Sequence, residues 1–190
     1  MLTAINYQDQ KTLIKLAKQS IEYGFNHPQE RLLIAVEKYS APLQEHKACF
    51  VTIEKFKQLR GCIGALIARQ PLVLEVIESA FAAAFLDKRF PKVTPNELAD
   101  LKFFISILTK PEQIKFTSEE DLITKLRPNI DGLILKSGNA TGTFLPSVWE
   151  QLPQPKEFLN NLKIKAGLAT DYWSNKIQVA RYETMVITEE

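Results

Sequence analysis

The chain of 190 residues is poor in the side chains that build metal centres and disulfide frameworks, with two cysteines, Cys49 and Cys62, and two histidines. A disulfide-stabilised fold is therefore excluded, and so is a zinc site of paired Cys and His ligands. An excess of charge of one sign is also absent, because 24 Lys and Arg stand against 22 Asp and Glu, for a formal net charge of +2. That balance provides no strong attraction to nucleic acid or to anionic lipid.

Long hydrophobic runs are absent as well. The longest nearly uncharged stretch, residues 62–74, is interrupted by Arg69, Gln70 and Pro71 and is too short to span a bilayer. The N-terminus shows no basic segment followed by an apolar one, so no signal peptide is expected. Hydrophobic residues make up 45% of the chain and charged residues 24%, which is typical of a globular protein. We therefore expect a cytoplasmic protein with no membrane contact, no bound metal and no cofactor.

The first half of the chain alternates helical and extended patterns. Helices are expected at 9–23, with Gly24 as the C-terminal stop, at 30–39, and in the most apolar stretch, 71–87. Strands are expected at 48–53 and 59–66, paired as a hairpin across Lys57 and Gln58. That turn would place Cys62 opposite Ile53 and Cys49 opposite Leu66, so no disulfide is expected between them.

The second half repeats the mixture of element types. Strands are expected at 103–108, at 132–135 and 140–145 around a turn at 137–139, and at 177–187; helices are expected at 118–126, 147–152 and 155–166. Hairpins combined with helices, rather than strict βαβ alternation, indicate an α+β fold with a mostly antiparallel sheet and flanking helices.

The segment Leu-Arg-Gly-Cys-Ile-Gly at 59–64 is the first candidate for chemistry. On a strand, Arg60 and Cys62 share one face, and a guanidinium beside a thiol lowers the thiol pKa and raises the reactive thiolate fraction. Gly61 and Gly64 leave backbone bare where a ligand could approach. A buried sulfur packed against the following helix explains the same residues, since free cysteines are among the most buried residue types. Both interpretations stay open.

The segment Asp-Lys-Arg-Phe-Pro at 87–91 is the second candidate. Its alternating acid and bases fit a local ion pair at the end of a helix, and they also fit an anion-binding corner of a cleft. Asp87 is the less ordinary residue, because a carboxylate next to buried surface needs a partner. Both histidines fall in polar, loop-like stretches, so neither is expected to serve as a base.

Several short motifs follow one another along the chain: 59–64, 87–91, Glu97-Leu98 with 106–108, 144–146, and Lys165-Ala-Gly167. In sequence and order these motifs resemble the AMMECR domain family, known in prokaryotes as AmmeMemoRadiSam system protein A. The resemblance runs from about residue 48 to the C-terminus, and the hexapeptide at 59–64 is its most specific part.

The resemblance implies a single AMMECR-like domain over residues 1–190, with two related halves that contribute to one sheet system and form a larger and a smaller lobe around a cleft. The family has no established reaction. Its prokaryotic members are commonly encoded beside a MEMO-like protein and a radical SAM enzyme, which implies a role in a pathway with these partners. The motif residues that carry over are Arg60, Gly61, Cys62 and Gly64, with Asp87, Arg89 and Phe90 as neighbours in the cleft.

The leading hypothesis is therefore a cleft thiol site that acts on or binds a small polar ligand. Cys62 would be the nucleophile or covalent attachment point and Arg60 would stabilise an anion. Ligand contacts would come from Gly61, Gly64, Asp87, Arg89 and Phe90.

Two alternatives stay open. A non-catalytic adaptor for the MEMO-like and radical SAM partners is favoured by the missing base and the missing metal ligands. An RNA-binding module could use Lys55, Phe56, Lys57 and Arg60, since basic and aromatic side chains together bind single strands, but the near-neutral net charge disfavours it.

Overall fold

The computed structural model of the protein describes residues 5–189, which form two compact units. Unit 1 comprises the chain up to Leu108 and from Met185 onward, and unit 2 is Thr109–Thr184. The chain therefore passes between the units twice. No helix in the described residues is long and apolar enough to cross a membrane.

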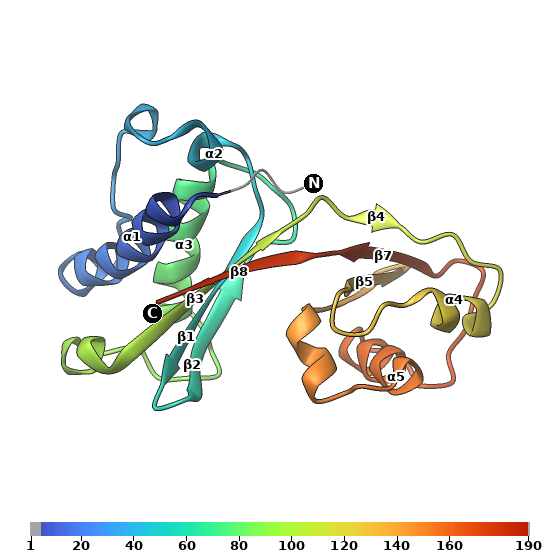
Figure 1. Ribbon diagram of the computed structural model, residues 1–190. Helices are drawn as coiled ribbons and strands as arrows, with labels where there is room; N and C mark the ends of the chain where they lie inside the picture. Colours follow the sequence, from blue (N-terminus) through green and yellow to red (C-terminus); the bar gives the residue numbers. More distant parts are fainter. Residues whose placement is uncertain (1–4, 190) are drawn as a thin grey trace. The chain divides into compact units, whose positions relative to one another are not determined.

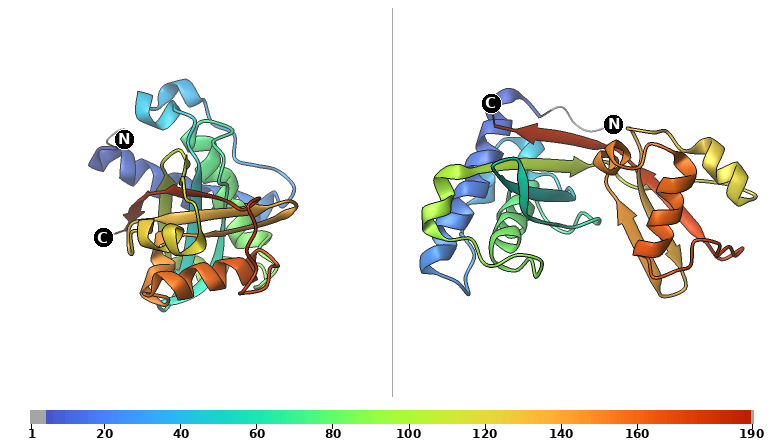
Figure 2. Two further views of the ribbon diagram at one scale, coloured as in Figure 1. Left: turned by 90° about the vertical axis from the view of Figure 1, so that its right-hand side faces the viewer. Right: turned by 90° about the horizontal axis from the view of Figure 1, so that it is seen from below.

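Unit 1 packs two long helices on one face of a four-stranded sheet with the strand order β2-β1-β3-β8 (Figures 1 and 2). Its helices are α1 (Tyr7–Asn26), η1 (Val36–Lys38), α2 (Ala41–Gln44), α3 (Leu72–Phe85) and η2 (Pro95–Asp100), where η denotes a 3₁₀ helix. Its strands are β1 (Cys49–Lys55), β2 (Gln58–Gly64), β3 (Leu101–Leu108) and β8 (Thr184–Thr188). Alternate β1 residues, Cys49, Val51 and Ile53, are fully buried under the helices, as period-two burial requires.

Unit 2 holds a second four-stranded sheet, of order β4-β7-β5-β6 (Figure 1). Its elements are β4 (Glu112–Gln113), α4 (Glu119–Lys125), β5 (Gly132–Ser137), β6 (Ala140–Phe144), η3 (Pro146–Glu150), α5 (Pro155–Lys165) and β7 (Gln178–Tyr182). Its core includes Trp149, whose ring stacks on that of Phe158 with 3.7 Å between centroids. The predicted α+β class with antiparallel pairing is confirmed, but the single sheet system is wrong, because each unit has a sheet of its own.

One predicted helix boundary is wrong for a reason of packing, and two predicted helices are shorter than expected. Gly24 does not end α1, which continues to Asn26. A Cβ atom at Gly24 would lie 2.6 Å from a ring carbon of Phe85 and 2.9 Å from one of Phe81, so this glycine permits close contact between α1 and α3. The helix expected at 30–39 is reduced to η1, and the one expected at 147–152 to η3.

The hairpin turn is one residue earlier than predicted. Phe56 and Lys57 form it with φ angles of 52° and 64°, as a tight two-residue hairpin loop requires. The pairing also shifts between Ile53 and Glu54, which places Cys62 opposite Thr52 instead of Ile53. The expected absence of a disulfide is nevertheless correct, since both cysteines are free.

The strand predicted at 177–187 is in fact two strands in two sheets. The break is at Glu183, whose N–H donates to Thr109 Oγ1 at 2.8 Å and whose carbonyl accepts from the Thr109 N–H at 2.9 Å. Residues before the break pair within the unit 2 sheet as β7, and residues after it form β8 of unit 1. The hydrophobic pattern did not indicate this change of sheet, because apolar residues occur on both sides of Glu183.

Candidate functional site

The main chain of Cys62 is bound from outside the sheet by residues that follow α3. Strand β2 is an edge strand, so Cys62, which pairs with Thr52 on one side, has no strand on the other. Its N–H donates to Asp87 Oδ2 at 3.0 Å, and its carbonyl accepts from Arg89 Nη2 at 3.2 Å. Two side chains thus take the place of a neighbouring strand and protect an edge that could otherwise pair with another chain.

Asp87 and Arg89 form a bidentate ion pair. Asp87 Oδ1 accepts from Arg89 Nε at 3.0 Å, and Oδ2 accepts from Nη2 at 2.7 Å. The Asp87 side chain is only 4% exposed, whereas that of Arg89 is 56% exposed. The guanidinium lowers the pKa of Asp87 from its usual 3.8 to about 2, with further help from the Cys62 N–H. The carboxylate expected to need a partner therefore has two.

The space beside Gly61 and Gly64 is filled by the protein's own backbone. A Cβ atom at Gly61 would lie 2.1 Å from the carbonyl oxygen of Ala83 in α3, and one at Gly64 would lie 2.2 Å from the carbonyl oxygen of Cys49. Each glycine is therefore required for close approach of two chain segments.

Arg60 forms hydrogen bonds with the segment that follows Arg89. It sits where β2 carries one extra residue opposite β1, between Leu59 and Gly61. Its Nε donates to Glu97 Oε1 at 3.0 Å, its Nη1 to the Pro91 carbonyl at 2.8 Å, and its Nη2 to the Lys92 carbonyl at 3.2 Å.

Glu97 completes this network. It also accepts from Lys55 Nζ at 3.2 Å and from the Thr94 N–H at 3.0 Å, the latter as part of a capping box for η2. Its pKa falls to about 2, chiefly because of the hydrogen bonds from Arg60. We refer to residues 87–97 as the edge segment, because Asp87, Arg89 and Glu97 together fix it along β2.

The Cys62 thiol lies beside Thr52, on the face of the sheet that α1 and α3 do not cover. Its Sγ is 3.0 Å from Thr52 Oγ1, and the side chain is half-buried. Arg89 is the charged side chain that interacts electrostatically with Cys62. The pKa of Arg89 is raised mainly by Asp87 and to a lesser degree by Cys62. The cation that the sequence assigned to this thiol was Arg60. In the structure Arg60 is the extra residue of β2, which interrupts the alternation of faces, and it is Arg89 that donates to the Cys62 carbonyl.

The remaining predicted neighbours have clear positions. Phe90 is half-buried, and its ring centroid is 5.4 Å from the guanidinium carbon of Arg89. Cys49 is fully buried, which raises the pKa of its thiol well above the usual range. The sequence missed Thr52 as a partner of Cys62, since only the corrected register places the two side by side. Within the described part of the chain, no group of three or more His, Cys, Asp or Glu side chains could hold a metal ion.

The chain is similar over nearly all of its length to other proteins. The sequence model of the AMMECR1 family matches residues 14–187. A protein of Thermofilum pendens is 36% identical over 93% of this chain and 88% of its own length, and one of Methanothermobacter thermautotrophicus is 35% identical over 95% and 94%. The crystal structure of the uncharacterized protein PH0010 from Pyrococcus horikoshii covers 94% of this chain and 90% of its own, with a TM-score of 0.85 and 34% identity. The chain therefore belongs to the AMMECR1 family.

Proposed function

We propose that the sheet face around Cys62 is a thiol site that binds a small anionic ligand. The observation that carries the proposal is that only part of the Arg89 guanidinium is hydrogen-bonded within the protein. One edge, Nε and Nη2, is fixed by Asp87 and by the Cys62 carbonyl. The other, Nη1, has no hydrogen-bond partner among residues 5–189, and the side chain is 56% exposed.

An arginine held in this way is a prepared anion receptor. Its orientation is set before a ligand arrives, so less side-chain entropy is lost on binding. Its two outward N–H groups suit a carboxylate or phosphate oxygen. Its charge also favours the thiolate of Cys62, which is the form that reacts with or binds an electrophilic ligand. Thr52 contributes a hydroxyl that can donate to the Cys62 sulfur, with the two atoms 3.0 Å apart.

A non-catalytic role is the second candidate, and one observation favours it. Arg60, Gly61, Gly64 and Asp87 are all engaged with the protein's own chain, so Cys62, Arg89 and Phe90 are the predicted site residues that are left for a ligand. In either case the family resemblance suggests a component of a pathway with MEMO-like and radical SAM partners. Co-elution of the protein with those two partners, at micromolar concentration, tests this association.

Alkylation of the native protein with iodoacetate and iodoacetamide tests the thiol site. We expect Cys62 to react at least about tenfold faster than buried Cys49 and to prefer anionic iodoacetate, because Arg89 attracts it. Arg89→Ala should reduce the ratio of the two rates and move the pH profile of Cys62 upward by roughly half a unit or more. Site-resolved mass spectrometry at a series of pH values gives both quantities.

Lys88→Ala is the matched control, since Lys88 is an exposed cation next to Arg89 whose side chain forms no hydrogen bond or ion pair with Asp87 or Cys62 among the described residues. It should leave the reagent preference unchanged. Equal rates at Cys62 and Cys49, or equal effects of the Arg89 and Lys88 variants, would refute the thiol site.

A further inference from the structure

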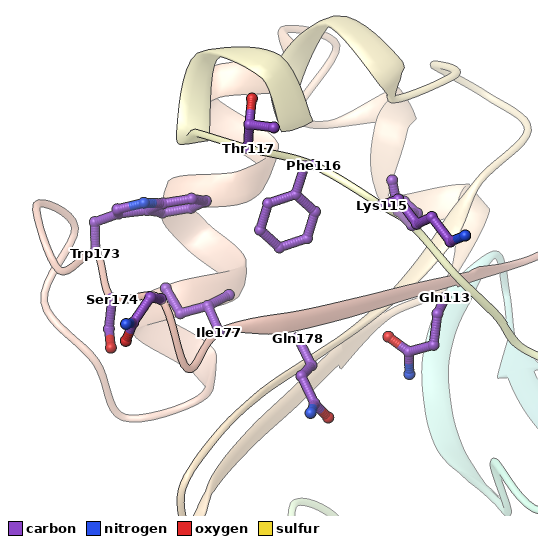
Figure 3. A pocket seen from close by; sticks show the side chains of 10 residues that line it. Gln113, Lys115, Phe116, Thr117, Trp173, Ser174, Ile177 and Gln178 are labelled. Atoms are coloured by element: carbon purple, nitrogen blue, oxygen red, sulfur yellow. The ribbon is translucent and has the colours of Figure 1, made fainter.

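Unit 2 contains a pocket that none of the motif residues reaches. Its volume is about 540 Å³, which is within the range of small-molecule sites. It opens beside the two-residue edge strand β4, between the segment after that strand and the loop that precedes β7 (Figure 3). All of its lining residues lie within Thr109–Thr184, so it belongs entirely to unit 2.

Two aromatic rings form one side of this pocket. Phe116 and Trp173 are half-buried, with their ring centroids 5.7 Å apart and their planes tilted by 55°. Below them lies Ile177, which is 5% exposed and belongs to the core of unit 2 (Figure 3). The pocket therefore has an apolar wall with two aromatic surfaces, suited to a flat ring.

Trp173 is held in place by a buried cation. Lys163 in α5 has no exposed surface, and its Nζ is 5.7 Å from the Trp173 ring centroid. The same Nζ donates to Glu119 Oε1 at 2.7 Å and to the Thr170 carbonyl at 2.9 Å. The adjacent Tyr172 shares a hydrogen bond with Ser137 in β5. The loop is thus tied to α5 and to β5, and the Trp173 ring is preorganised.

The polar side chains of the pocket are three amides, the hydroxyls of Thr117 and Ser174, and one cation. Gln113, Asn175 and Gln178 are exposed and carry both donors and acceptors, while no residue that lines the pocket has a carboxylate. Lys115 lies at the rim of the pocket (Figure 3). Its side chain forms no ion pair with any residue from 5 to 189. A positively charged ligand would find no counter-charge among these residues, whereas a negatively charged one would find Lys115.

We infer that this pocket binds a planar heteroaromatic ring of the nucleobase type, carried by a phosphate-bearing ligand. The ring would stack on the exposed surface of Trp173 and Phe116, which is how unpaired bases bind to proteins. Glutamine and asparagine side chains can pair with a base edge through two hydrogen bonds. Lys115 would attract the phosphate. This site is independent of the thiol site, because it uses different residues in a different unit.

Titration with AMP, GMP, CMP and UMP tests the inference. Of the two tryptophans, Trp149 is buried and stacked on Phe158, so quenching of fluorescence reports Trp173. We expect saturable quenching by at least one nucleotide with a Kd of about 1 mM or tighter. Trp173→Phe should abolish the quenching but retain binding in calorimetry, whereas Trp173→Ala should weaken binding about tenfold or more.

Gln178→Ala is a gentler variant on an exposed strand position, and we expect it to weaken binding several-fold. Gln151→Ala, an exposed glutamine of unit 2 outside the pocket, is its control. A single-stranded hexanucleotide distinguishes the two sources of a base: tighter, salt-sensitive binding indicates a strand, and equal affinity indicates a free nucleotide. Absence of saturable binding by all four nucleotides overturns the inference. So does fluorescence quenching by maltose, used as a ligand without an aromatic ring, that equals the quenching by nucleotides. An equal loss of affinity in Gln178→Ala and Gln151→Ala also overturns it.

Discussion

Gly61→Ala is expected to unfold unit 1 roughly 6–12 °C below the wild-type protein, corresponding to a loss of about 3 kcal/mol or more. The new methyl group would lie 2.1 Å from the Ala83 carbonyl oxygen, much closer than two non-bonded atoms can approach. Because that oxygen is helix backbone, it cannot move aside as a flexible side chain could. Either α3 or β2 must shift, and both carry core residues of unit 1.

The measurement can separate the two units. Both tryptophans lie in unit 2, so their fluorescence follows the unfolding of that unit. The far-UV circular dichroism signal of helix comes mainly from α1 and α3 of unit 1. In Gly61→Ala the dichroism midpoint should fall. Gln58→Ala, an exposed change on the same strand, is the control and should leave the midpoint within about 2 °C of wild type. A Gly61→Ala midpoint equal to that of Gln58→Ala would contradict the packing role.

Local signals in the sequence predicted the elements of this fold better than the arrangement of the site. The hairpin 132–144 and the helix ending before Gly167 follow from turn and capping residues, and the structure has Gly138 and Gly167 at positive φ as such residues allow. No turn or capping residue indicates the extra residue that Arg60 adds to β2. It depends on how β2 fits against α3 and the edge segment, which are contacts between distant parts of the chain.

The family motif illustrates the same difference. Arg60 and Cys62 are two residues apart, so an unbroken strand would place them on one face, but the extra residue at Arg60 interrupts that alternation. The family resemblance did imply which two segments meet, and 59–64 and 87–91 are in direct hydrogen-bonded contact. The sequence could not show that Asp87 contacts the main chain of Cys62. A carboxylate that accepts from a backbone N–H does not restrict which side chain that residue carries.

Asp87→Asn is expected to destabilise the protein by about 2 kcal/mol at neutral pH, with an effect that disappears in acid. The folded-state pKa of Asp87 is about 2, below its usual 3.8, mainly because Arg89 hydrogen-bonds both carboxylate oxygens. A carboxylate whose pKa is lowered by folding contributes stability above the pKa of the unfolded chain and loses it as the pH falls through the folded pKa. The stability difference between wild type and Asp87→Asn should therefore be complete above about pH 5 and shrink between about pH 4 and 2.

Urea unfolding at a series of pH values between 7 and 3 measures that difference. Asparagine keeps an oxygen that can accept from the Cys62 N–H, so what changes is the charge that faces Arg89. Asp100→Asn, an exposed acid of unit 1, is the control and should show no difference from wild type that depends on pH. Glu97 also loses its charge in strong acid, but it does so equally in both proteins and cancels from the comparison. A gap between wild type and Asp87→Asn that stays constant down to pH 3 would show that the Asp87–Arg89 pair does not stabilise the edge segment through its charge.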